Sequence, residues 1–86
     1  MYEVLLDRHA ERQLDKFPLD DTFKRIDKAI RSLKLNPRPH GVIKLFGKIY
    51  RIRVGDYRII YSINDKDKVV LVAEIRHRDE RTYRGL

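Results

Sequence analysis

Arginines recur at short intervals in the second half of the chain, and their spacing is the first sign of chemistry. Arg51, Arg53 and Arg58 stand on either side of Gly55-Asp56, a dipeptide typical of a two-residue turn between two strands. Such a turn sets Arg53 directly opposite Arg58 and leaves both on one face of the hairpin, together with Arg51. Like charges opposite each other destabilise a sheet, whereas guanidinium groups are well suited to bind a phosphate. The sequence therefore predicts an anion-binding face.

The charge of the whole chain agrees with this prediction. The formal net charge is +7 over 86 residues, and residues 38–58 alone hold 6 Lys or Arg against 1 Asp or Glu. A concentrated basic surface attracts polyanions, above all nucleic acid. The chain has no Cys, which excludes disulfides and thiolate metal sites. His9 and His40 have no partner at metal-ligand spacing, so we expect neither a metal nor a cofactor.

No stretch of the sequence has the pattern of a membrane or signal segment. No apolar run approaches the roughly 18 residues that span a bilayer, and Met1-Tyr2-Glu3 does not begin a signal peptide. The lack of Cys is consistent with a reducing compartment. We therefore expect one domain, residues 1–86, in the cytoplasm and without a membrane partner.

The first half of the chain predicts a strand and two helices. Residues 2–6 are an apolar run typical of a strand, and Asp7 is a good cap for a helix that ends before Pro18. Asp20 and Asp21 can cap a second helix, whose apolar positions recur at helical spacing. These positions are Leu19, Phe23, Ile26, Ile30 and Leu33. The two helices are predicted to form an antiparallel hairpin with one apolar seam.

After a proline-rich loop the apolar period changes to two, which indicates strands. Four strands are expected, at residues 42–46, 49–54, 57–64 and 68–76. The order of elements predicts an α+β domain, with an N-terminal strand and helical hairpin packed on a four- to five-stranded, mostly antiparallel sheet and a short C-terminal segment.

A three-residue turn at 65–67 predicts how the last two strands pair. It sets Tyr61 opposite Leu71 and Arg58 opposite Glu74. The side chains expected to face the helices are Tyr50, Ile52, Tyr57, Ile59, Tyr61 and Leu71. The arginine face would then also carry an apolar patch, which usually marks a protein partner. The patch would consist of Ile60, Val70 and Val72.

A longer set of residues resembles the RelE/ParE toxin superfamily. The matching residues are Leu35-Asn36-Pro37-Arg38-Pro39, Gly41, Lys44-Leu45, Gly47, residues 50–61, Arg76-His77-Arg78 and Tyr83. The resemblance covers nearly the whole chain, and the Gly-Asp-Tyr-Arg-Ile-Ile-Tyr stretch at 55–61 is specific to the superfamily. The closing His-Arg with a following Tyr points to the RelE branch.

The resemblance implies a function and its partners. RelE-like toxins of type II toxin–antitoxin pairs enter the ribosomal A site and cleave mRNA without metal, by attack of the ribose 2′-hydroxyl on the adjacent phosphate. The implied partners are the ribosome, mRNA and an acidic, inhibitory antitoxin that forms a hetero-oligomer with the toxin.

The resemblance also assigns roles to individual residues. Arg51 and Arg53 match basic residues of the central hairpin, which are lysines in the best-known member, and Arg58 matches the residue that holds the phosphate. Arg78 matches the residue proposed to protonate the leaving oxygen, and Tyr83 matches an aromatic that stacks on a base. Because arginine is effectively never deprotonated, we interpret the four arginines as electrostatic stabilisers of the transition state.

The groups that would move protons stay open in the sequence. Glu74 is expected on the face of Arg58, and His77 ends the same strand with a side chain suited to acid–base work. Other basic residues are expected to contact RNA or the ribosome, namely Lys44, Lys48, Arg76 and Arg81.

A second function stays open beside the nuclease. ParE-like toxins inhibit DNA gyrase by binding and cleave no RNA. They mostly lack the basic and aromatic set of the RelE branch, so its presence here favours the endoribonuclease.

Overall fold

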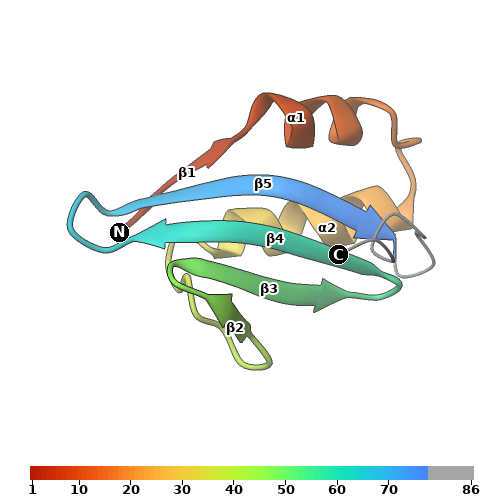
Figure 1. The fold of residues 1–86 in the computed structure, drawn as a ribbon. Coiled ribbons are helices and arrows are strands. Elements are labelled where there is room, and N and C mark those ends of the chain that lie inside the picture. Colours follow the sequence, from red (N-terminus) through yellow and green to blue (C-terminus); the bar gives the residue numbers. More distant parts are fainter. Residues whose placement is uncertain (78–86) are drawn as a thin grey trace.

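The chain folds into a helical hairpin on a five-stranded sheet (Figure 1). The structure is a computed structural model that describes residues 1–77. Its elements are β1 (Glu3–Leu6), α1 (Arg8–Asp15), α2 (Asp21–Ser32), β2 (Ile43–Phe46), β3 (Ile49–Val54), β4 (Tyr57–Asn64) and β5 (Val69–His77). The strand order is β1-β5-β4-β3-β2, with β1 parallel to β5 and every other pair antiparallel. The predicted α+β class is confirmed. None of the helices in residues 1–77 is long and apolar enough to cross a membrane.

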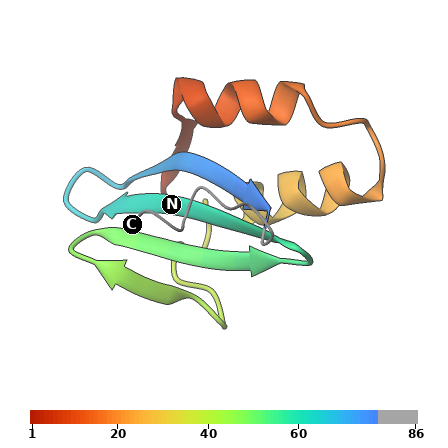
Figure 2. The ribbon, with the colours of Figure 1, turned by 45° about the vertical axis from the view of Figure 1, so that its right-hand side comes forward.

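The two helices cover one face of the sheet. Figure 2 shows α1 running in one direction and α2 returning antiparallel to it, as the apolar pattern predicts. Asp20 caps α2, because its carboxylate accepts a hydrogen bond of 3.1 Å from the backbone N–H of Phe23. Ala10, Ile26 and Leu33 are completely buried in one shared core. Leu19 does not join the apolar seam; it precedes the cap and is 83% exposed.

The pairing of β3 with β4 is the one that the Gly55-Asp56 turn predicts. Tyr50 lies opposite Tyr61, and Arg53 lies opposite Arg58. Gly55 has a φ of +59°, and a Cβ on it would lie 3.1 Å from the Arg25 guanidinium. Glycine therefore suits this turn for its backbone angle, whereas the Arg25 side chain is exposed and could move aside for a Cβ.

The pairing of β4 with β5 differs from the prediction. The turn holds four residues, 65–68, because Asn64 pairs with Val69. The Asn64 side chain holds the turn through hydrogen bonds to the backbone N–H and the carboxylate of Asp67, and Lys68 takes a positive φ of 57°. One extra turn residue moves each side chain of the strand to the other face.

The longer turn changes which residues of β5 are buried. Val70 and Val72, expected on the arginine face, are completely buried in the core. Leu71, expected in the core, lies on the opposite face and is 37% exposed. The predicted pairing of Tyr61 with Leu71 is therefore wrong, since Tyr61 pairs with Val72.

A β-bulge then shifts the pairing of β5 a second time. Tyr61 pairs with Val72 and Ile60 with Glu74, so Ala73 is an extra residue on β5. Beyond the bulge, Ile75 turns into the core and is 2% exposed. The predicted contact of Arg58 with Glu74 across the strands is also wrong, because Arg58 lies opposite Arg76.

Gln13 of α1 holds the strand just beyond this bulge. Its side-chain amide donates a 2.6 Å hydrogen bond to the Ile75 carbonyl, and its carbonyl oxygen accepts one of 2.7 Å from the Ile75 N–H. Strand β1 pairs with β5 only as far as Val72. Gln13 therefore provides hydrogen-bond partners for the backbone of β5 beyond the point where β1 ends.

A polar cluster fastens the loop after α2 to the β4–β5 turn. Arg38 binds Asp65 through both terminal nitrogens, at 2.8 and 3.2 Å, and lies over the Tyr50 ring. Tyr2 donates a 2.6 Å hydrogen bond to the same carboxylate. These hydrogen bonds, that from Arg38 first, lower the pKa of Asp65 from 3.8 to about 2. Buried Tyr61 donates a 2.7 Å hydrogen bond to the Pro37 carbonyl, which fixes the start of the loop.

Candidate functional site

The sheet face turned away from the helices, here called the outer face, carries its side chains in cross-strand rows, and three of these rows bear on the site. The first, the arginine row, consists of Arg53, Arg58 and Arg76, neighbours on three strands. The middle row consists of Glu74, Ile60, Arg51 and Ile43. The third, the apolar row, crosses all five strands and consists of Leu5, Leu71, Ser62, Ile49 and Phe46. A further row beyond it consists of Asn64, Val69 and Glu3. The outer face therefore changes from basic at the arginine row to apolar at the third row.

The arginine row lies where β3 turns into β4 and β5 ends, at the right of Figure 1. Residues opposite each other on antiparallel strands have Cα atoms about 4.5–5.5 Å apart. Three guanidinium groups in such a row repel one another, and the cost falls when an anion binds between them. Arg58 stands in the middle of the row and is half-buried. The geometry suits a phosphate, which accepts several hydrogen bonds from arginines at once.

A groove of about 370 Å³ runs along the outer face beside this row. It is lined by Leu45, Phe46, Ile49, Arg51, Arg58, Ile60, Glu74 and Arg76. Glu74 is the one carboxylate among these lining residues, and its Oε2 lies 2.8 Å from Nε of Arg76. The groove therefore combines cations, a single proton acceptor of fixed orientation and an apolar wall.

The structure separates several predicted site residues from this groove. His77 pairs with Tyr57 on the face that the helices cover, and its ring meets the Tyr57 ring edge-on at 4.9 Å. It lines a different pocket, next to α1, so it is not placed to move protons at the arginine row. Lys44 pairs with Tyr50 and lies on that same side of the sheet, and Lys48 lies in the turn before β3, at the apolar end of the outer face. Arg78, Arg81 and Tyr83 lie outside the described residues.

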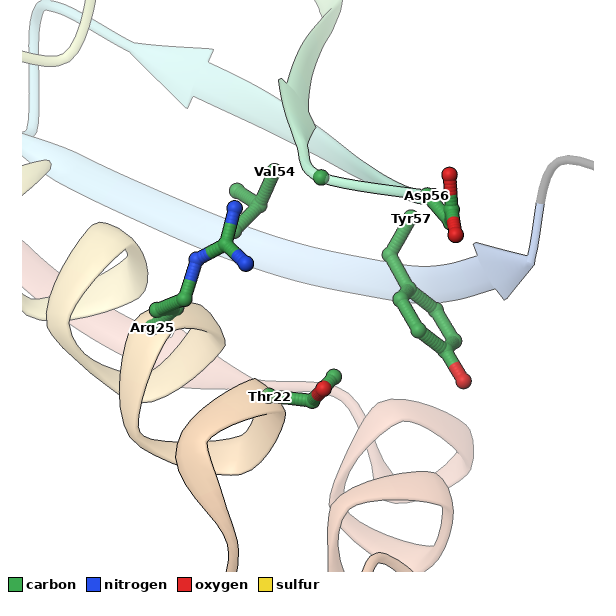
Figure 3. A pocket seen from close by; sticks show the side chains of 6 residues that line it. Thr22, Arg25, Val54, Asp56 and Tyr57 are labelled. Atoms are coloured by element: carbon green, nitrogen blue, oxygen red, sulfur yellow. The ribbon is translucent and has the colours of Figure 1, made fainter.

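A second hollow lies between α2 and the β3–β4 turn (Figure 3). Its volume is about 260 Å³, and it is lined by Thr22, Arg25, Val54, Gly55, Asp56 and Tyr57. Figure 3 shows Arg25 reaching from α2 toward Val54. A single cation beside one carboxylate is a weaker anion site than the arginine row. Within residues 1–77, no three His, Cys, Asp or Glu side chains gather as metal ligands.

Two features of the groove are absent from the sequence-based prediction. The first is the place of Arg76 beside Arg58, and the second is the position of Phe46 on the groove wall. The place of Arg76 could have been found from the spacing of the apolar residues Val70, Val72 and Ile75. Two positions separate the first pair and three separate the second, which indicates a bulge because a regular strand alternates every two residues. Two adjacent apolar residues in an otherwise alternating strand, Leu45 and Phe46, signal the position of Phe46.

Comparisons with known proteins agree with this architecture. A family model described as the ParE toxin of the type II toxin–antitoxin system parDE matches residues 4–82. The RelE1 protein of Methanocaldococcus jannaschii is 25% identical in an alignment of 83 positions that covers 91% of each chain.

Solved structures of complexes with an antitoxin extend the comparison. The toxin chain in the RelE–RelB complex of Pyrococcus horikoshii is 34% identical and superposes with a TM-score of 0.81, covering 92% of this chain and 97% of that one. The intact RelBE complex of Escherichia coli shares the fold, with 21% identity and a TM-score of 0.77 over 94% of this chain and 100% of that one. The chain therefore belongs to the RelE/ParE family of toxins of type II toxin–antitoxin systems.

Proposed function

We propose that the protein is a ribosome-dependent endoribonuclease whose outer face binds and cleaves mRNA in the A site. The observation that carries this proposal is the arginine row, Arg53, Arg58 and Arg76, beside the groove. Glu74 balances one of these charges through its ion pair with Arg76, and an anionic substrate would neutralise the excess of positive charge that is left in the row. The likeness to the RelE chain of Pyrococcus horikoshii supports the same branch of the family.

Arg58, in the middle of the row, holds the scissile phosphate, with Arg53 and Arg76 on either side. As the 2′-oxygen bonds to phosphorus and the bond from phosphorus to the 5′-oxygen breaks, negative charge grows on the phosphoryl oxygens. Arg58 and Arg76 line the groove, whereas the Arg53 side chain lines a separate pocket next to Pro39 and Gly41, so the first two would face that charge directly. Preorganised charges of this kind lower a barrier most. The products are a 2′,3′-cyclic phosphate and a 5′-hydroxyl end.

Glu74 accepts the proton of the attacking 2′-hydroxyl, and the leaving 5′-oxygen takes a proton from water. Glu74 is the one carboxylate on the groove wall, and its ion pair with Arg76 fixes its direction. A general base must first lie within hydrogen-bond reach of the proton that it takes, and a carboxylate on the groove wall would be near a bound ribose. Arg51, next to Ile60 in the middle row, binds the phosphate of a neighbouring nucleotide.

The partner that controls this activity is an antitoxin with an acidic, helical or extended segment that lies across the outer face. The basic end of the face suits its carboxylates, and the exposed apolar side chains beyond suit its apolar residues. Relatives from Pyrococcus horikoshii and Mycobacterium tuberculosis were crystallised as toxin–antitoxin complexes. Occupation of the groove would exclude RNA directly.

Cleavage of mRNA on purified ribosomes tests the proposal. Arg58→Ala removes a preorganised charge donor, so the rate should fall about 100-fold to 1,000-fold while the fold survives. Lys28→Ala, on the exposed side of α2, is the matched control and should cleave at the wild-type rate. A folded Arg58→Ala protein that cleaves as fast as the wild type would show that the site is misassigned.

A gyrase inhibitor is the second candidate, and the description of the matching family model as a ParE toxin favours it. Mapping transcript 5′ ends after induction separates the two functions. Cuts inside translated frames support the endoribonuclease. Intact mRNA together with gyrase-linked DNA damage supports the binding-only toxin.

A further inference from the structure

Two bulges shape the groove on the outer face, one from each side. The bulge at Ala73 turns Glu74 and Arg76 onto this face, as described above. The second bulge is in β2, where Lys44 pairs with Tyr50 and Phe46 with Ile49, so Leu45 is the extra residue. Without it, Phe46 would continue the alternation from Lys44 and lie on the helix side. Bulges often re-aim a side chain next to an active site, and here both add to one groove.

Phe46 is the most exposed large apolar side chain of this sheet. Its exposed fraction is 70%, against 45% for Ile43 and 43% for Leu5. It lines the same groove as Arg51 and Arg58. A ligand that covers the ring gains free energy because it removes this apolar surface from water.

We propose that Phe46 is a stacking platform for a nucleobase of the bound RNA, a proposal that rests on the proposed function. The flat ring, with cations further along the groove, matches single-stranded RNA, in which bases stack on aromatic side chains and phosphates bind arginines. The groove of about 370 Å³ falls in the range of about 300–1,000 Å³ typical of ligand pockets.

The distance along the sheet decides which nucleotide stacks on the ring. Phe46 pairs with Ile49, and Arg53 in the arginine row lies four positions further along the same strand. Four residues of strand span about 14 Å. The stacked base therefore belongs to a nucleotide near the scissile phosphate, and not to the reacting ribose itself. Phe46 is a binding residue that sets sequence context, and it does not take part in bond breaking.

An apolar peptide is the competing occupant of this wall, and the chemistry of the substitutions separates it from a base. Leucine keeps an apolar surface of similar size and loses the aromatic face, whereas tryptophan keeps the aromatic face. The chain has no Trp, so Phe46→Trp also places a unique fluorophore on the groove wall. Fluorescence then reports stacking directly, without a need for cleavage.

The experiment combines ribosome-dependent cleavage with fluorescence. Phe46→Leu should slow cleavage roughly 5-fold to 100-fold, the loss expected for one base–aromatic stack, and Phe46→Trp should stay within about 2-fold of the wild type. A 2′-O-methyl oligoadenylate hexamer, which lacks the attacking hydroxyl, should quench Phe46→Trp at low salt. An abasic hexamer with the same backbone should bind without quenching. Leu19→Ala, an exposed apolar change outside this face, is the control and should behave as the wild type.

The outcomes separate this proposal from the endoribonuclease itself. Phe46→Leu cleaving at the wild-type rate, or equal fluorescence with the two hexamers, overturns the stacking platform and favours a peptide on this wall. If the wild type cleaves no mRNA, the proposed function fails, and the fluorescence alone decides whether a base stacks on this ring. Base-dependent quenching then still supports the platform.

Discussion

The suitability of Arg58 for binding an anion depends more on its neighbours than on its own exposure. It is half-buried, and arginines flank it on both adjacent strands. A guanidinium in this position offers planar donors in a fixed fork, which an ammonium group does not. Arg53, in contrast, is exposed at the end of the same row. The two residues should therefore differ in how well lysine replaces them.

Lysine substitutions test this difference at single positions. Arg53→Lys keeps a cation at an exposed site and should cleave ribosome-bound mRNA within a few-fold of the wild type. Arg58→Lys loses the fork and should slow cleavage by roughly 10-fold or more. Single-turnover rates on programmed ribosomes measure both. Equal rates for the two variants would mean that charge alone matters in the row.

At the scale of the elements, the sequence predicts the local pattern well and the irregularities poorly. The Gly55-Asp56 turn, the Asp20 cap and the α+β order are all confirmed. The β4–β5 pairing is wrong because it depends on one residue of turn length and on the extra residue Ala73. Neither follows from propensity, since both are fixed by which side chains the finished core can bury.

The sequence predicts the candidate site only in part, because the positions of its residues depend on the same irregularities of strand pairing. Arg51, Arg53 and Arg58 share one face because their hairpin has a short turn of predictable register. The position of Arg76 depends on the bulge, which no local signal other than the spacing of Val70, Val72 and Ile75 reveals. His77 was expected near the chemistry, and the same bulge leaves it on the helix side.

Gln13 should contribute to stability through its two hydrogen bonds to Ile75. Gln13→Ala leaves both backbone groups without this partner at a partly buried site, which should lower the free energy of unfolding by about 1–3 kcal/mol. Urea unfolding followed by circular dichroism measures the change. The neighbouring exposed Arg12→Ala should change it by less than about 0.5 kcal/mol. Equal effects of the two substitutions would contradict this role.

The Asp65 cluster should make stability depend on pH in the acid range. The folded pKa of Asp65, about 2, lies below its ordinary value of 3.8, so the ionised group favours the folded state. Asp65→Asn should therefore melt at a lower temperature than the wild type above pH 4. The difference should shrink as pH falls from about 4 toward 2, where the wild-type carboxylate becomes protonated. A difference in melting temperature that is constant over this range would exclude Asp65 as its source.

At the scale of the whole molecule, the sheet has one face packed by helices and one that carries the arginine row and the apolar row. The helix-covered face holds the core, with Tyr61, Ile59 and Val72 completely buried. The outer face exposes Leu5, Leu71 and Phe46 among residues 1–77. A partner that covers this face would therefore stabilise the fold as well as inhibit the proposed activity.

Antitoxin binding should show both effects. The melting temperature should rise with antitoxin concentration, and the affinity should fall as salt increases, because charges on the outer face steer and hold the partner. Arg53→Ala and Arg76→Ala should weaken binding in titration calorimetry, whereas Lys28→Ala should not. Hydrogen exchange that shows protection of α2 alone, with β3 to β5 unchanged, would contradict an antitoxin on the outer face.

The bulge at Leu45 also has a consequence for self-association. Strand β2 is short and forms an edge of the sheet, and three of its apolar side chains, Ile43, Leu45 and Phe46, are exposed. A flat edge of this composition would be a template for strands of other copies, the first step toward aggregates. The extra residue breaks the regular hydrogen-bond spacing that such stacking needs. The irregularity that aims Phe46 into the groove therefore also disfavours the addition of another strand at this apolar edge.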